Sequence, residues 1–293
     1  IDATELGQQG TGEMLSNFQG MDKVEIRRSD SKSITCLEVN TTRDALSDIE
    51  VRKAFMQCIN TETILGIVYQ GVNWKEDRLS SLSILPWMDG YEDNLPQDVS
   101  ANITADAQIA AAKKTLEDAG YELGSDGYYA KGGKQVAFGF TTIGDSNVTK
   151  NRAAAIQKMA KDAGMNITID NKPSSDFSKT LVRGQWDVFL LGWSVSSATY
   201  NNGGQLFGST SESNFTHAGS KELDAKFLAV TGIEDHAKQM KAFNEAEKEA
   251  LKSYAFIPLY SGADVIVCKK GLANWGPALL LDIVAENVGW EKE

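Results

Sequence analysis

The chain has 293 residues, of which 42% are hydrophobic and 24% charged, a composition typical of a globular protein with one large or two modest domains. Its formal net charge of −11 disfavours contact with phosphate backbones, so we expect no nucleic-acid partner. The sequence contains no run near the ~18 apolar residues that a membrane span needs, and its first residues lack the basic start and apolar core of a signal peptide.

The first third of the chain predicts two strands, a helix and a loop. Residues 23–40 predict two strands, because apolar and polar side chains alternate in their second half. Residues 47–69 predict one helix with Ser47 or Asp48 as its N-cap, since the apolar side chains that follow share one face. Residues 71–102 are irregular and contain two prolines, so they predict a long loop on the surface.

Helices and strands then alternate. Gly120 and Gly164 each follow a helical pattern and are suited to end it. The expected helices cover residues 104–120, 149–164, 174–184, 220–230 and 234–254, and the expected strands lie within 128–143, 165–169, 186–193 and 255–272. Residues 128–143 form a hairpin in this scheme. The order of elements predicts an α/β fold with helices packed on a sheet.

The three cysteines, Cys36, Cys58 and Cys268, are odd in number and form no CxxC pair. This spacing argues against a disulfide framework and against a thiolate zinc site. Two interpretations remain open: buried free cysteines, or one bridge formed in an oxidising compartment. The two histidines, His217 and His236, lack metal-ligand spacing, so we predict no metal site.

Signatures of enzymes are missing from the sequence. It has no P-loop, no dinucleotide-binding glycine pattern after a strand, no GxSxG and no HExxH. We therefore expect neither catalysis nor a cofactor. Two other classes stay open as alternatives, a hydrolase built on an α/β lobe and an interaction module. Turnover of peptide or glycoside substrates would favour the first, and dimerisation without ligand binding would favour the second.

A candidate binding site follows the strand predicted at Val188–Leu191. This strand ends in Gly192-Trp193, and residues 194–211 carry no charge. Ligands of α/β sheets bind beyond the carboxyl ends of strands, where an aromatic ring can stack on a peptide group or a sugar. The alternative is that Trp193 belongs to the core and the loop is a surface turn. The candidate ligand-binding residues are Gly192, Trp193, Ser194, Ser196, Tyr200 and Asn202.

Six segments in chain order carry a resemblance to a known family. One of them, residues 37–64, reads LEVNTTRDALSDIEVRKAFMQCINTETI, and another, residues 177–193, ends in the Gly-Trp pair. The six segments are residues 1–3, 37–64, 116–138, 153–169, 177–193 and 257–272. Together they resemble the family 5 extracellular solute-binding proteins. These are receptor subunits of ABC importers for dipeptides, oligopeptides, nickel chelates and some oligosaccharides.

The resemblance implies a type II periplasmic-binding-protein-like fold, in which two lobes joined by crossover strands close on a ligand. Residues 1–35 would then be a fragment of lobe I, residues 36–256 a complete lobe II, and residues 257–293 a return to lobe I. The rest of lobe I, with an export signal and half of the binding site, would lie outside this sequence. The resemblance also implies a location at the extracellular face of the membrane or in the periplasm, with a lipid anchor on the full-length protein.

The expected function is capture of oligopeptides for delivery to ABC permease subunits in the membrane. In peptide-binding members of the family, an aspartate three positions after the tryptophan pairs with the ligand's α-ammonium group. Here that position is Ser196, which cannot form an ion pair. Asp145, in the loop after a predicted strand, is a candidate replacement. The departure also leaves open an oligosaccharide ligand in the same fold, to which Trp193 and the neutral loop are suited.

Overall fold

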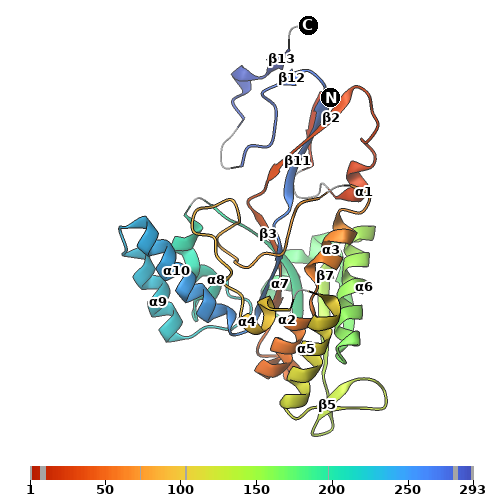
Figure 1. Ribbon diagram of the computed structural model, residues 1–293, viewed down its shortest axis with the longest axis vertical. Helices are drawn as coiled ribbons and strands as arrows, with labels where there is room; N and C mark the ends of the chain where they lie inside the picture. Colours follow the sequence, from red (N-terminus) through yellow and green to blue (C-terminus); the bar gives the residue numbers. More distant parts are fainter. Residues whose placement is uncertain are drawn as a thin grey trace.

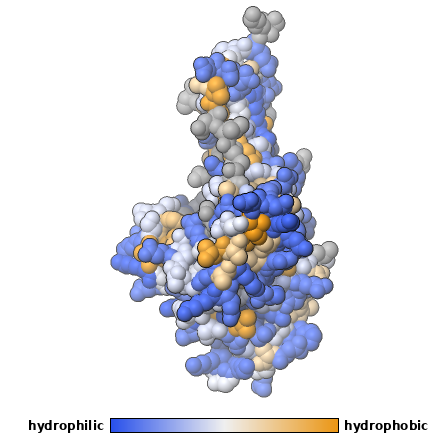
Figure 2. Space-filling view, turned by 90° about the vertical axis from the view of Figure 1, so that its left-hand side faces the viewer, coloured by the Kyte–Doolittle hydropathy of each residue, from blue (hydrophilic) through white to orange (hydrophobic). Residues whose placement is uncertain are grey.

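The computed structural model describes residues 2–6, 11–72, 74–102, 104–196, 198–279 and 283–291. Figure 1 shows an α/β body from which a narrow arm of β-strands rises, and both chain ends lie on this arm. The surface of the face shown in Figure 2 is mostly hydrophilic, with scattered apolar patches on the body. The hydrophilic surface agrees with the acidic composition.

The body is built on one mixed sheet with the strand order β10-β3-β9-β7-β8. β7 is parallel to β8 and β9, whereas β3 is antiparallel to β9 and β10. The strands are β3 (Ser33–Val39), β7 (Ala137–Ile143), β8 (Asn166–Lys172), β9 (Val188–Ser194) and β10 (Phe256–Tyr260). Helices connect β7 to β8 and β8 to β9, so the predicted α/β class is confirmed.

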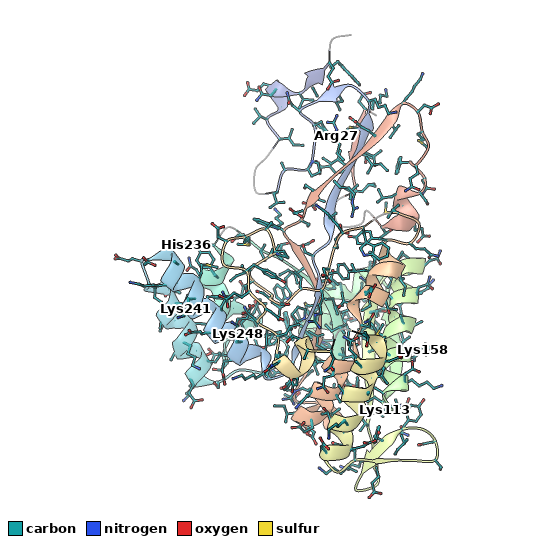
Figure 3. The ribbon with its side chains drawn as sticks, viewed as in Figure 1. Arg27, Lys113, Lys158, His236, Lys241 and Lys248 are labelled. Carbon is teal, nitrogen blue, oxygen red and sulfur yellow. The ribbon has the colours of Figure 1, made fainter. Side chains whose placement is uncertain are left out.

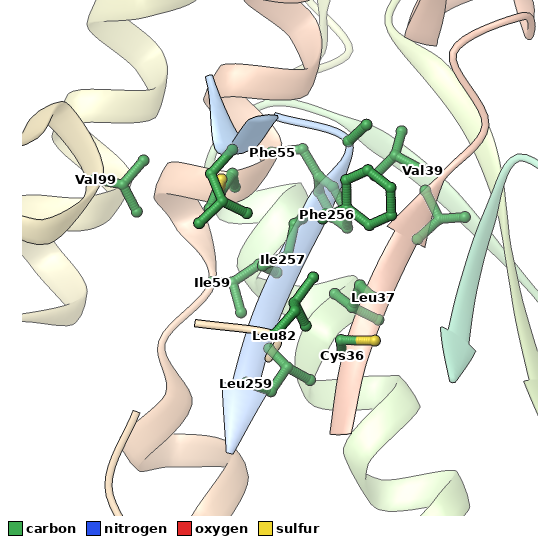
Figure 4. Packing of buried hydrophobic residues seen from close by; sticks show 14 of the residues in the cluster. Cys36, Leu37, Val39, Phe55, Ile59, Leu82, Val99, Phe256, Ile257 and Leu259 are labelled. Atoms are coloured by element: carbon green, nitrogen blue, oxygen red, sulfur yellow. The ribbon is translucent and has the colours of Figure 1, made fainter. Parts of the chain in front are cut away.

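Helices cover both faces of this sheet (Figure 1). On one face, Phe207 of α8 packs against Phe256 of β10 with ring centroids 5.0 Å apart. On the other, Phe55 of α2 packs against Phe138 of β7 with ring centroids 5.2 Å apart, and Figure 4 shows part of the buried cluster where β10 runs beside the strand with Leu37. The longer helices are α2 (Ile49–Cys58), α3 (Thr61–Val68), α5 (Ala105–Asp118), α6 (Asn147–Asp162), α7 (Phe177–Arg183), α9 (Lys221–Thr231) and α10 (His236–Leu251), with the shorter α8 (Gly203–Phe207).

The arm is a three-stranded antiparallel sheet with the order β1-β11-β2. Its strands are β1 (Ala3–Glu5), β2 (Val24–Asp30) and β11 (Ala263–Lys269). β2 continues into β3 through residues 31–32, and β10 continues into β11 through residues 261–262. The two crossings lie side by side, because Ser261 Oγ donates to the carbonyl of Ser31 at 3.3 Å. The predicted lobe boundaries at 35/36 and 256/257 stay predictions. The chain passes from one sheet to the other at residues 31–32 and 261–262, which lie a few residues closer to the arm than these boundaries.

The remaining α-helices and strands are short. They are α1 (Gly12–Leu15), α4 (Gln97–Ser100), β4 (Glu122–Leu123), β5 (Tyr129–Lys131), β6 (Lys134–Gln135), β12 (Leu272–Ala273) and β13 (Gly289–Trp290). β5 and β6 are joined by Gly132 and Gly133, both with positive φ, which confirms the predicted hairpin turn.

Local capping explains where the helices begin and end. Asp48 caps α2 by accepting a hydrogen bond from the Glu50 amide at 2.9 Å, and Gly120 and Gly164 follow α5 and α6 with φ near 80° as predicted. The single helix expected over residues 47–69 is two helices. Asn60 interrupts it, because its Oδ1 accepts from the Thr63 amide at 2.8 Å and starts α3.

Replacing Asp48 by alanine should lower the free energy of unfolding by about 1 kcal/mol, because the first turn of α2 loses its side-chain acceptor. Asp48→Asn should cost less than half as much, since asparagine caps helices equally well. Urea unfolding of both variants measures the difference. Equal losses in the two variants would mean that the carboxylate's contact with the Tyr121 hydroxyl, at 2.8 Å, matters more than the cap.

The long loop is a place where the prediction was wrong. Leu82, Ile84 and Leu85 are buried, so residues 71–102 belong partly to the core rather than to the surface. Their backbone is held by Glu247 of α10, which is fully buried and accepts from the Leu82 amide at 3.0 Å and from Asn94 Nδ2 at 2.6 Å. Burial raises the pKa of Glu247, while these hydrogen bonds oppose the shift.

Other expectations from composition can be compared with the structure. All three cysteines are buried and free, which confirms the first of the two interpretations. Arg52 of α2 donates to the backbone carbonyls of Leu46, Ser47 and Ser253. No helix in the described part of the chain is both long and apolar enough to cross a bilayer.

Candidate functional site

The end of β9 has one unpaired edge. Among the strands that the structure describes, β3 pairs with β9 along its whole length, from Val188 to Ser194, whereas β7 pairs with it only at Val188 and Phe189. The Val195 amide donates to the Lys32 carbonyl at 2.7 Å, so alternate residues direct their backbone groups away from β3. Gly192 and Ser194 therefore present N–H and C=O groups toward the side that β7 has left. We call residues 192–194 the β9 edge.

The edge exists because β7 diverges toward β8. β7 stays paired with β8 up to Ile143, and the Gly144 amide donates to the Lys172 carbonyl at 2.9 Å. Gly144 has a φ of 98°, a conformation suited to glycine, and it turns the chain into Asp145 and α6. The carboxyl ends of β7 and β9 thus separate, as expected where α/β sheets bind ligands.

A pocket of about 470 Å³ opens at the β9 edge. Its volume lies in the range of small-molecule sites. β3, β9 and β10 supply its floor, and α6, α1 and the loop after β7 supply its walls. We call it the edge pocket, and the lining residues used below are Glu13, Asp145, Thr149, Arg152, Gly192 and Tyr260.

The edge pocket contains charges of both signs. Glu13 and Asp145 are exposed, and Glu13 Oε1 accepts from Asn147 Nδ2 at 3.1 Å. Arg152 of α6 is half-buried and donates from Nη1 to the Tyr260 hydroxyl at 2.7 Å. Such a pocket can bind a cationic group and an anionic group of one ligand.

Trp193 points to the opposite face of the sheet, because neighbouring residues of a strand alternate in direction. Its Nε1 donates to Oε1 of Glu38 at 2.8 Å, and its ring stacks on Phe215 with centroids 6.4 Å apart. Glu38 is 1% exposed, and burial raises its pKa to about 7 although the Trp193 hydrogen bond opposes the shift. Oε2 of Glu38 has no hydrogen-bond partner among the described residues. Glu38 therefore orients the half-buried indole.

The other residues of the predicted site lie beyond the edge. Ser194 and Ser196 are exposed at the strand end. Tyr200 packs against His236 with ring centroids 5.6 Å apart. Figure 3 shows His236 at the start of α10, on the opposite side of the body from α6. The side chain of Asn202 lies outside what the structure describes. Of the six predicted residues, Gly192 lines the edge pocket, and ligand contact by all six stays a prediction.

Sequence reasoning missed Arg152, Tyr260 and Glu38. A signal existed for Glu38, since it is the one acid in an otherwise apolar and neutral strand. Another existed for Arg152, since the first turns of a helix that follows a strand face the ligand end of an α/β sheet. Tyr260 had none. Asp145, predicted from its place after a strand, does line the edge pocket. Within the described ranges, no group of three or more potential ligand residues could hold a metal ion.

Comparison with known proteins supports the resemblance. Residues 6–215 match the model of the bacterial extracellular solute-binding proteins, family 5 Middle. The oligopeptide-binding protein OppA of Mycobacterium tuberculosis is 24% identical over 292 residues, which cover 99% of this chain and 47% of the relative. The chain thus spans about half the length of that relative.

Solved structures share the fold. The periplasmic EDTA-binding protein EppA matches with a TM-score of 0.87 at 19% identity, over all of this chain and 55% of that one. The oligopeptide-binding protein AppA from Bacillus subtilis, in complex with a nonapeptide, matches with a TM-score of 0.81 at 17% identity, over all of this chain and 56% of that one. These matches confirm the predicted type II periplasmic-binding-protein-like fold.

Proposed function

Because the chain belongs to the bacterial extracellular solute-binding proteins of family 5, we propose that it captures oligopeptides for an ABC importer. It would bind them outside the cell membrane or in the periplasm, without catalysis, and deliver them to permease subunits. The oligopeptide-binding relative supports this ligand class. The oligosaccharide alternative has no support among the proteins compared above.

The observation that carries the proposal is the unpaired β9 edge. An extended peptide can add to such an edge as a further strand, with its main chain bonded to Gly192 and Ser194. Main-chain hydrogen bonds do not depend on side-chain identity. A site of this kind therefore suits a receptor for peptides of varied sequence.

The carboxylates of the edge pocket can bind the ammonium group at the peptide's amino terminus. Ser196 offers only a neutral hydrogen bond, which contributes about 1 kcal/mol. Asp145 and Glu13 line the pocket and are carboxylates, and charge-assisted hydrogen bonds are about twice as strong as neutral ones. We assign the ligand's ammonium group to this acidic wall.

Lobe closure would complete the site. In this proposal, residues 36–256 form lobe II, and residues 1–35 and 257–293 belong to lobe I. The adjacent crossings at residues 31–32 and 261–262 would act as the hinge. A ligand that contacts both lobes favours the closed state, because its affinity for that state is higher.

A thermal-shift screen of the full-length natural protein tests the proposal. We expect free peptides of two to eight residues to stabilise it, by about 2.7 kcal/mol at 100 times the dissociation constant. N-acetylated peptides should bind more weakly if the acidic wall holds the ammonium group. Stabilisation by oligosaccharides alone would show that the ligand class is wrong.

A further inference from the structure

Arg152 lies in the wall of the edge pocket and has no carboxylate partner among the residues that the structure describes. The ion pairs among the described residues do not include it. Its Nε is buried and has no hydrogen-bond partner in the described part of the chain, while its Nη1 donates to the neutral Tyr260 hydroxyl. A partly buried guanidinium in this state keeps unused donors and an uncompensated charge.

The surroundings hold Arg152 in place without neutralising it. It lies on α6, whose first turn is fixed by the Ser146 cap at 3.1 Å from the Thr149 amide. Tyr260 is 4% exposed and anchors the guanidinium from β10. The acids that share the pocket, Glu13 and Asp145, are not within 4 Å of Arg152 in the described structure. The positive group is therefore separated from the acidic wall.

A guanidinium of this kind matches a carboxylate. Its planar fork of donors binds the two oxygens of a carboxylate in a fixed geometry, and the bond is stronger where water is partly excluded. A free peptide has one group of each sign, an ammonium at its start and a carboxylate at its end. The acidic wall and Arg152 offer one partner for each.

We propose that Arg152 binds a carboxylate of the ligand and makes the edge pocket selective for peptides with a free carboxyl group near the β9 edge. This inference rests on the proposed function and adds the chemical group that is recognised. The carboxylate can come from the peptide's carboxyl terminus or from an acidic side chain. The terminus is favoured, because it is present in peptides of every sequence.

The test uses calorimetry on the full-length natural protein with alanine peptides of two to five residues, each as the free acid and as the C-terminal amide. We expect the wild type to bind the acid about 10-fold more tightly than the amide, the effect of one charge-assisted bond. Arg152→Gln should bind both forms equally. Tyr260→Phe, which keeps the guanidinium, should retain the preference for the acid.

Further peptides and variants identify the source of the carboxylate and control for folding. Amidated peptides with one glutamate restore tight binding only if a side chain can supply the group. Arg152→Lys keeps the charge but not the fork and should retain part of the preference, and the melting temperature of each variant verifies its fold. Equal binding of acid and amide by the wild type would overturn this inference and leave peptide capture standing. Binding of none of the peptides would overturn both.

Discussion

Replacing Gly192 by leucine should weaken peptide binding about 100-fold, because a side chain there would occupy the edge pocket and displace a peptide from the β9 edge. The loss of two main-chain hydrogen bonds, at about 1 kcal/mol each, with added steric overlap accounts for this factor. Calorimetric titration of the full-length protein with the best-binding peptide measures it.

The fold should tolerate this change. Gly192 does not have a positive φ, and a Cβ there would meet the Ile34 carbonyl oxygen at 3.6 Å, an ordinary contact distance. The residue is exposed and lines the edge pocket, so the new side chain points into open space. We therefore expect little change in melting temperature.

The matched control is Gly204→Leu. Gly204 lies in α8, is exposed, and has no atom within 4 Å of the position of a Cβ. It is not among the residues that line the edge pocket, so its variant should bind peptide normally. Unchanged binding by Gly192→Leu would contradict a ligand path along the β9 edge.

Glu38 should make the protein less stable as the pH rises. Its pKa is about 7 in the folded protein, against an ordinary value of 4.5, because it is buried beside Trp193. Between these values the unfolded chain releases the proton while the folded chain keeps it. The stabilising contribution is thus fully present below pH 4.5 and is lost as the pH rises through 7, and it amounts to about 3 kcal/mol.

Comparison with Glu38→Gln isolates this contribution. Glutamine stays neutral, keeps an oxygen to accept the Trp193 hydrogen bond, and has almost the same shape. Urea unfolding at several pH values should show the wild type losing about 3 kcal/mol relative to the variant between acidic and weakly alkaline solution. Glu245→Gln, at an exposed position of α10, controls for the loss of one carboxylate. Parallel curves for wild type and Glu38→Gln would show that the folded protein does not retain this proton.

The same group connects stability to the site. Glu38 orients Trp193 at the end of the strand that carries the β9 edge. Ionisation of Glu38 above pH 7 strengthens its hydrogen bond with the indole, because a charged acceptor bonds more strongly than a neutral one. The emission of Trp193 should shift near pH 7, where Glu38 ionises in the folded protein, at the upper end of the pH interval over which the stability falls.

Local chemistry in the sequence was sufficient to predict many of the points where helices and turns begin and end. The cap at Asp48, the glycines that end α5 and α6, and the hairpin glycines act within a few residues, so their effects can be predicted without a structure. The division of the first long helix was missed because Asn60 acts as a cap inside an apolar pattern. The buried part of residues 71–102 was missed because its acceptor, Glu247, lies far along the chain.

The sequence by itself determined the family, the α/β class and the position of the strand that ends in Gly192-Trp193. Only the tertiary structure decided which of these two neighbours faces the edge pocket. Alternation along a strand requires that they point to opposite faces, but the place of the pocket depends on where β7 leaves β9. Tertiary structure also joined Arg152 to Tyr260, 108 residues later, since packing of α6 against the sheet brings them together. Spacing along the chain carries no information about such a contact.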